Sequence, residues 1–186
     1  MKRLFAAVDI SEEARTFASD LIKQLRSGHS GKGISWSKPE NLHITIKFLG
    51  NTEPEREAEV TQTLSRLAAS TLPFRFYLDK PEILGKRVLS VSVHSDTVTV
   101  FSLEMMIDTE CERLGFPREG RRFHPHLTLG RIRQLEGTRE LTKRFLQTPI
   151  EPLGFDVREI VLYESELGSG GSIYRNVETF PLLFSE

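Results

Sequence analysis

His43-Ile44-Thr45-Ile46-Lys47-Phe48-Leu49-Gly50 is the stretch from which the fold can be inferred. Successive side chains of a β-strand point to opposite faces, so a strand here has one apolar and one polar face. The apolar face carries Leu42, Ile44, Ile46 and Phe48, and the polar face carries His43, Thr45 and Lys47. We therefore expect a strand that packs against a core on one side and presents a histidine and a hydroxyl on the other.

A second stretch, His124-Pro125-His126-Leu127-Thr128-Leu129-Gly130-Arg131, shows a related pattern, with His126 and Thr128 on one face. A single His-x-Thr strand is weak evidence, because a lone histidine on a half-buried strand is more often structural than catalytic. The histidines at 43 and 126 lie 83 residues apart, and the flanking strands recur at the same offset. The sequence therefore indicates an internal repeat.

Both halves of the chain show the order strand, helix, His-x-Thr strand, helix, strand. The first half has predicted strands over 3–10 and 74–84, a helix to about residue 26 and a second helix. The second half has predicted strands over 87–93 and 155–166, a helix ending at Gly115 and a short helix, and an extra strand follows over 173–182. The predicted fold class is α+β, as one domain of two pseudo-symmetric lobes (roughly 3–84 and 87–167) of antiparallel sheet, with helices outside and an active-site cleft between them.

Helix starts are predicted from capping residues. Ser11 precedes the first helix, Thr52-Glu53-Pro54-Glu55 has the form of a capping box, Ser95 or Asp96 precedes the third helix, and Thr138 precedes the fourth. Gly28, Gly31 and Gly33 predict a loop, and His29 and His94 lie outside both motifs and are expected at the surface or in caps.

Composition indicates an ordinary globular chain, with 38% hydrophobic and 27% charged residues in 186 positions. The apolar run 4–8 is too short for a signal peptide or a membrane span. The single cysteine, Cys111, lies in a predicted helix and is expected to be a small buried side chain in a reducing compartment. We expect a cytoplasmic protein that does not bind membranes.

Charge is unevenly distributed, although the net charge of the chain is only −1. The segment 113–144 contains nine basic and three acidic residues. The second His-x-Thr strand lies inside this segment, which favours a local anion site over a long nucleic-acid track.

Two imidazoles and two hydroxyls in one cleft suit displacement at phosphorus. Histidine titrates near neutral pH, so one imidazole can accept a proton while the other donates one. Threonine hydroxyls can bind phosphate oxygens, and Arg131 can add positive charge where negative charge accumulates. Strand alternation places Arg131 on the other face, but a bulge or bend at Gly130 could turn it toward the cleft.

The motifs Asn41-Leu42-His43-Ile44-Thr45 and Phe123-His124-Pro125-His126-Leu127-Thr128-Leu129 resemble those of the 2H phosphoesterase superfamily. The similarity is greatest to its RNA 2′,3′-cyclic phosphodiesterase branch, also called 2′-5′ RNA ligase. It extends to the opening strand Arg3-Leu4-Phe5 and to Tyr163, Ser165 and Tyr174.

This resemblance implies a bilobal enzyme without metal or cofactor that opens a terminal 2′,3′-cyclic phosphate on RNA to a 2′-phosphate, with reversible 2′-5′ ligation as a further family activity. By the family pattern His43 is the proton donor and His126 the acceptor. The same pattern makes Thr45, Thr128 and Arg131 phosphate ligands and Phe48 an aromatic near the base. Alternation instead places Phe48 in the core and Lys47 on the cleft face. Its partners are RNA ends or nucleotides with a cyclic phosphate, and a monomer is favoured because two lobes complete one site.

Neighbouring charges suggest which histidine is the base. His126 is close in sequence to Arg121, Arg122 and Arg131, and positive neighbours lower the pKa of an imidazole. We therefore expect the neutral form at His126 and the protonated form at His43, in agreement with the family pattern.

Three other interpretations stay open. A zinc site from His43, His124, His126 and Cys111 has no standard ligand spacing. A non-catalytic module for RNA ends would use the same cleft. An enzyme for another cyclic or 2′-5′-linked nucleotide would share the motifs.

Overall fold

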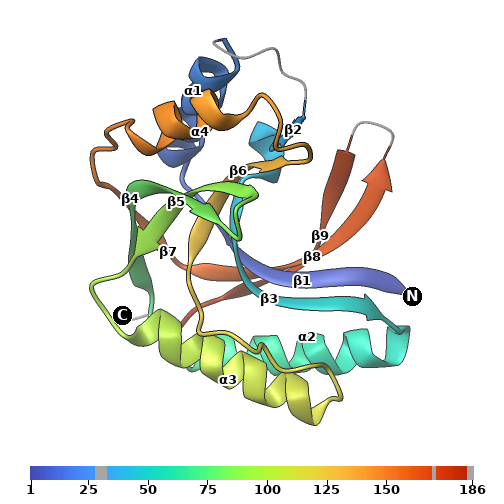
Figure 1. The fold of residues 1–186 in the computed structure, drawn as a ribbon. Coiled ribbons are helices and arrows are strands. Elements are labelled where there is room, and N and C mark those ends of the chain that lie inside the picture. Colours follow the sequence, from blue (N-terminus) through green and yellow to red (C-terminus); the bar gives the residue numbers. More distant parts are fainter. Residues whose placement is uncertain (28–32, 169–170, 184–186) are drawn as a thin grey trace.

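The computed structural model describes residues 1–27, 33–168 and 171–183 (Figure 1). Its elements are β1 (Lys2–Asp9), α1 (Glu12–Ser27), β2 (Ile34–Trp36), the 3-10 helix η1 (Pro39–Asn41), β3 (His43–Thr52), α2 (Pro54–Ala69), β4 (Phe74–Leu84), β5 (Val88–His94), α3 (Thr99–Arg113), β6 (His126–Ile132), α4 (Arg139–Leu146), β7 (Leu153–Val157), β8 (Glu159–Gly168) and β9 (Gly171–Pro181).

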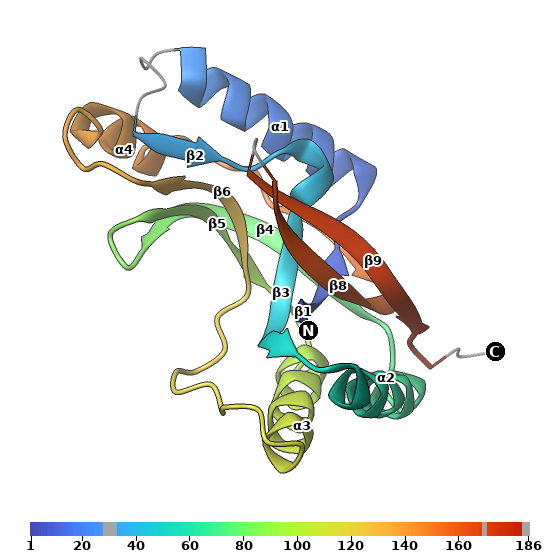
Figure 2. The ribbon, with the colours of Figure 1, turned by 90° about the vertical axis from the view of Figure 1, so that its right-hand side faces the viewer.

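The strands form two antiparallel sheets, which confirms the predicted α+β class. Sheet A has the order β3-β1-β8-β9, and sheet B has the order β2-β6-β5-β4-β7. Helices α2 and α3 lie together beside sheet A, whereas α1 and α4 lie at the opposite end of the molecule beside sheet B (Figures 1 and 2). The two His-x-Thr strands, β3 and β6, are thus in different sheets.

Each sheet takes strands from both halves of the chain. The strand predicted to close the first half, β4, pairs with β5 and β7 in sheet B. A tight turn at Gly85 and Lys86, whose φ angles are 53° and 63°, folds β4 directly back onto β5. The predicted strand 155–166 is in fact two strands separated at Arg158, with β7 in sheet B and β8 in sheet A. The division into two repeated lobes of one domain stays a prediction.

The helix starts agree only partly with the capping predictions. The Ser11 hydroxyl accepts a hydrogen bond from the Ala14 amide at 3.1 Å, as expected of a cap. The capping box at Thr52 is wrong, because α2 begins at Pro54 and the Thr52 hydroxyl donates to the Gly50 carbonyl instead. The third helix follows Val98 rather than Ser95 or Asp96.

Two further sequence predictions need correction. Thr138 precedes α4 as predicted, but its hydroxyl donates to the Leu135 carbonyl and caps nothing. Strand β2 was not predicted. Two of the three glycines expected to form a loop before it, Gly28 and Gly31, lie outside the described residues, as does His29.

Apolar side chains at helical spacing form the core as predicted. The buried residues on α2 are Val60, Leu64, Leu67 and Ala68, and those on α3 include Leu103, Ile107 and Cys111. Burial raises the pKa of the Cys111 thiol to about 11, so this cysteine stays protonated as a small apolar side chain. In the part of the chain that the structure describes, no helix has both the length and the hydropathy to cross a bilayer.

Candidate active site

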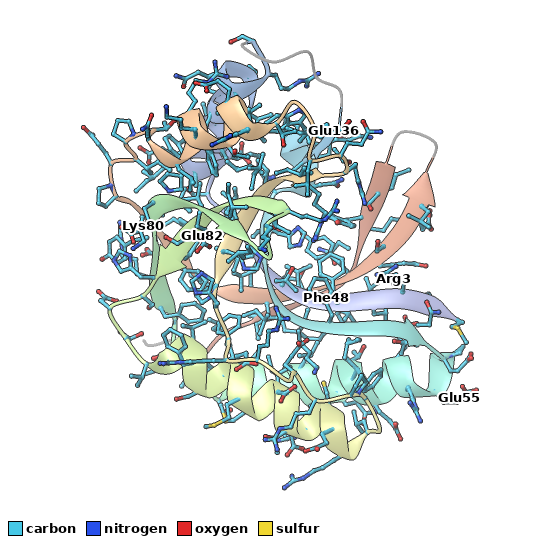
Figure 3. The ribbon with its side chains drawn as sticks, in the orientation of Figure 1. Arg3, Phe48, Glu55, Lys80, Glu82 and Glu136 are labelled. Atoms are coloured by element: carbon cyan, nitrogen blue, oxygen red, sulfur yellow. The ribbon has the colours of Figure 1, made fainter. Side chains whose placement is uncertain are left out.

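A cavity of about 580 Å³ lies where the two sheets meet, and all six candidate site residues line it. They are His43, Thr45 and Phe48 from β3 and His126, Thr128 and Arg131 from β6. Figure 3 shows Phe48 and Arg3 on the side of β3 and β1 that faces sheet B. Residues 83 positions apart are therefore brought to one site, although their chemical roles stay predictions.

Both histidines are held by the same local hydrogen bond. His43 Nδ1 lies 2.7 Å from the Asn41 carbonyl oxygen, and His126 Nδ1 lies 2.8 Å from the His124 carbonyl oxygen. A carbonyl only accepts, so Nδ1 carries a hydrogen in each ring. The neutral imidazole then has a lone pair on Nε2, and the protonated imidazole has a second donor there. Each ring is thus oriented to exchange a proton through Nε2.

The first threonine is in direct contact with its histidine. His43 Nε2 lies 3.0 Å from Thr45 Oγ1. The second threonine is fixed through its backbone, because the Ser37 hydroxyl donates to the Thr128 carbonyl at 2.7 Å. This bond ties the loop before η1 to the strand that carries His126.

A β-bulge follows each His-x-Thr motif at the corresponding position. In the β1–β3 pair Ala7 is opposite Thr45 and Ala6 is opposite Lys47, so Ile46 is the extra residue. In the β5–β6 pair Ser90 is opposite Thr128 and Leu89 is opposite Gly130. Leu129 is the extra residue there, so each bulge lies three residues after its histidine. A bulge reverses the alternation of side chains beyond it.

The bulge in β3 makes the predicted orientations of Lys47 and Phe48 wrong. Lys47 is 1% exposed, and its ammonium donates to Asp108 Oδ1 at 2.6 Å and to the Pro117 carbonyl at 2.7 Å. Phe48 is 54% exposed and lines the cavity. Phe48 therefore lines the cavity and Lys47 does not, while the expected role of Phe48 beside a base stays a prediction.

The bulge in β6 turns Arg131 toward the cavity. Strand alternation alone would place it with Leu127 and Leu129 in the core, but beyond the bulge it is exposed and lines the cavity. The bulge considered at Gly130 is therefore present, one residue earlier. Gly130 itself faces Trp36, which an added Cβ would approach to 3.1 Å.

Aromatic rings surround His43. The ring centroids of Phe5 and Tyr174 lie 4.9 Å and 5.2 Å from that of His43. The Tyr163 hydroxyl donates to Asp9 Oδ1 at 2.7 Å, and burial together with this bond raises the pKa of the phenol. Tyr174 lines the cavity, whereas Tyr163 does not line it and stacks on Phe5 with ring centroids 5.4 Å apart. The His43 ring is therefore packed against aromatic side chains from β1 and β9.

Burial lowers the pKa of both imidazoles from their ordinary value. The Asn41 carbonyl and the Asp9 charge oppose this shift at His43, and the His124 carbonyl and the Glu82 charge oppose it at His126. Arg131 lowers the pKa of His126, as expected, but Arg15 lowers that of His43 in the same way. Arg121 and Arg122 do not line the cavity. Which of the two imidazoles is neutral therefore stays a prediction.

Several cavity residues were missed in the sequence. Arg3, Lys38 and Arg133 line the cavity beside the predicted residues. Arg133 follows Arg131 at the strand period of two, which was a usable signal. Arg3 and Lys38 carry no such signal, because only the meeting of the two sheets brings them to this site.

Two of the four residues considered for a zinc site, His124 and Cys111, contact other parts of the protein. His124 Nε2 lies 2.8 Å from Glu82 Oε2, and Cys111 is buried in the core. Across residues 1–27, 33–168 and 171–183 there is no group of three or more histidine, cysteine or acidic side chains that could hold a metal ion.

Comparison with known proteins identifies related chains over nearly the whole length. The family model described as the 2′-5′ RNA ligase superfamily matches residues 12–169. An RNA 2′,3′-cyclic phosphodiesterase of Archaeoglobus fulgidus is 30% identical over 183 residues, covering 96% of this chain and 99% of the relative. One of Methanocaldococcus jannaschii is 29% identical over 177 residues, covering 95% of this chain and 98% of the relative.

Solved structures share the fold. TT0787 of Thermus thermophilus superposes with a TM-score of 0.79 at 25% identity, with 97% of each chain covered. Escherichia coli LigT complexed with 3′-AMP superposes with a TM-score of 0.76 at 26% identity, covering 97% of this chain and 98% of LigT.

Proposed function

Because this chain belongs to the 2′-5′ RNA ligase superfamily, we propose that it hydrolyses the 2′,3′-cyclic phosphate at the end of an RNA to a 2′-phosphate. The observation that carries this proposal is a pair of imidazoles that line the same cavity. In each of them Nδ1 is hydrogen-bonded to the backbone carbonyl two residues earlier. Relatives of similar length are RNA 2′,3′-cyclic phosphodiesterases. Opening at the 3′ oxygen is inferred from this kinship.

The reaction uses the two imidazoles on opposite sides of phosphorus. His126 Nε2 accepts a proton from water as the new bond between oxygen and phosphorus forms. The bond between phosphorus and the 3′ oxygen breaks, and His43 Nε2 donates a proton to that oxygen. The products are a 2′-phosphate and a 3′-hydroxyl, and proton exchange with solvent restores both rings.

The remaining residues bind the substrate. Thr45 and Thr128 donate hydrogen bonds to the non-bridging phosphate oxygens, and Arg131 stabilises the negative charge that develops there. Phe48 presents an exposed ring for the terminal base. No step requires a metal, because imidazoles move both protons. We propose that one chain acts alone in the cytoplasm, since it supplies both histidines and its single cysteine is a buried thiol.

The proposed function is tested by incubating the purified protein with RNA oligonucleotides that end in a 2′,3′-cyclic phosphate, with and without EDTA. We expect conversion to the 2′-phosphate at the same rate in both, identified by phosphorus NMR. A 3′-phosphate product would place the enzyme in another branch of the family. Unchanged substrate would mean a binding module, and loss of activity in EDTA restored by a divalent ion would contradict the imidazole mechanism.

Ligation and other substrates are tested in the same assay. A ribose 5′-hydroxyl that replaces water as the attacking group would form a 2′-5′ linkage through the same proton transfers. We expect such a product only when a 5′-hydroxyl oligonucleotide is added in large excess, because water otherwise competes. Faster turnover of 2′-5′-linked or 3′,5′-cyclic nucleotides than of the 2′,3′-cyclic end would favour the alternative substrate class.

The pH dependence of kcat/KM follows from the two lowered imidazole pKa values. One ring must be neutral and the other protonated, so the profile is a bell whose two limbs report the two free-enzyme pKa values. Since burial lowers both pKa values, we expect the maximum below the ordinary histidine value of 6.5, whichever ring is the base. A maximum above pH 7 in measured kcat/KM would contradict this.

A further inference from the structure

Positive charge lines the cavity beyond what one cyclic phosphate requires. Of the described residues, four with basic side chains line it, Arg3, Lys38, Arg131 and Arg133, and no acidic residue does. In the part of the chain that the structure describes, none of these four side chains forms an ion pair or a hydrogen bond, whereas other cations such as Lys2, Arg66 and Arg75 do. The chain as a whole has nearly equal numbers of basic and acidic residues, 25 and 26.

A cavity lined by basic and not by acidic side chains favours a ligand with several negative charges. Like charges gathered in a cleft repel one another and raise the local concentration of an oppositely charged ligand. A cyclic phosphate carries one negative charge, and the proposed reaction already assigns Arg131 and the two threonines to it. Arg3, Lys38 and Arg133 have no role in that reaction, so they are available to a second phosphate.

The arrangement of the arginines suits consecutive phosphates of one strand. Arg131 is the penultimate residue of β6 and Arg133 directly follows the end of that strand. Both side chains are exposed, whereas Ile132 between them is buried. Arg3 projects into the same cavity from β1, the strand next to β3 in sheet A. The cavity also reaches the β8–β9 hairpin, where Ser165, Ser172 and the 87% exposed Leu167 line it.

We propose that Arg3 and Arg133, with Lys38 beside them, form a second phosphate subsite. It binds the phosphodiester on the 5′ oxygen of the terminal nucleotide, so the substrate is an RNA chain of at least two nucleotides rather than a mononucleotide. The subsite rests on the proposed function and specifies its substrate. It stabilises the bound RNA through charge and does not take part in proton transfer.

The test compares kcat/KM for four substrates that end in a 2′,3′-cyclic phosphate: a nucleoside, the same nucleoside with a 5′-phosphate, a dinucleotide, and a dinucleotide with a neutral methylphosphonate linkage. Hydrogen bonds to charged groups are stronger than those between neutral groups, so we expect kcat/KM of the dinucleotide to exceed that of the nucleoside by about tenfold or more. The methylphosphonate should lose this advantage. Added salt should reduce kcat/KM more steeply for the dinucleotide.

Two variants connect the effect to the subsite. Arg133→Gln and Arg3→Gln should each reduce the ratio of dinucleotide to nucleoside kcat/KM by about tenfold, mainly through KM. Arg139→Gln is the matched control, because Arg139 is an exposed arginine of the same basic segment that does not line the cavity. It should keep the wild-type ratio.

The outcomes separate this proposal from the proposed function. Equal kcat/KM for nucleoside and dinucleotide, or a methylphosphonate as good as the natural linkage, would overturn the subsite while leaving the hydrolysis in place. A full advantage for the 5′-phosphorylated nucleoside with no gain for the dinucleotide would mean a mononucleotide site and would also overturn it. Absence of turnover with all four substrates would instead reject the hydrolysis.

Discussion

His43→Ala and His126→Ala should each lower kcat by about two to four orders of magnitude, because each imidazole is proposed to transfer one proton in the transition state. Both side chains line the cavity, and both Nδ1 atoms are hydrogen-bonded to backbone carbonyls. The lower kcat would therefore reflect the loss of proton transfer through Nε2. His94→Ala is the control, because His94 is an exposed histidine that stacks on Tyr77 outside the cavity. It should retain wild-type kcat, and thermal unfolding checks that all three variants fold.

The two losses should differ when the leaving group changes. A nitrophenolate is a weak base that departs without a proton, so His43→Ala should recover much of its activity on a nitrophenyl phosphodiester. His126→Ala should not recover, because the attacking water still needs a base. Recovery in His126→Ala alone would reverse the roles. Recovery in neither would mean that both rings mainly bind phosphate.

Replacing Asp108 by Ala should lower the free energy of unfolding by about 3–5 kcal/mol, because it leaves the buried Lys47 ammonium without its anion. Lys47 is 1% exposed, and besides Asp108 it contacts the Pro117 carbonyl at 2.7 Å and Glu119 Oε1 at 3.9 Å. Lys47→Met should cost less, because Asp108 keeps the Glu119 amide at 3.0 Å and the Arg118 guanidinium at 3.2 Å. Urea unfolding of both variants measures the difference, and equal losses would contradict the asymmetry.

The same ion pair predicts a loss of stability in acid. Burial acts to raise the pKa of Asp108, but the hydrogen bond from Lys47 and then that from the Glu119 amide outweigh it and leave the pKa below 3.8. A carboxyl whose pKa is lower in the folded state contributes stability above its unfolded pKa and loses it as pH falls through the folded value. We expect this contribution to disappear below about pH 3.8 in wild type and to be absent from Asp108→Ala.

Some features depend on the residues of one strand or helix alone, and these were predictable. The alternation in 43–50 and 126–131 identified both His-x-Thr strands, because the side-chain period of a strand is a local property. The apolar spacing of α2, α3 and α4 predicted which residues are buried for the same reason. The offset of 83 residues then related the two strands without any knowledge of their separation in space.

Other features depend on which strands become neighbours, and the sequence alone did not show them. The bulges at Ile46 and Leu129 exist only because β3 and β6 pair with β1 and β5 at a given register. One extra residue exchanges the faces beyond it, so Lys47 enters the core while Phe48 and Arg131 reach the cavity. Long-range pairing also places β4, from the first half of the chain, in sheet B and β8, from the second half, in sheet A. The same pairing brings Arg3, Lys38 and Arg133 to one cavity. Local periodicity in the sequence does not encode which strands pair.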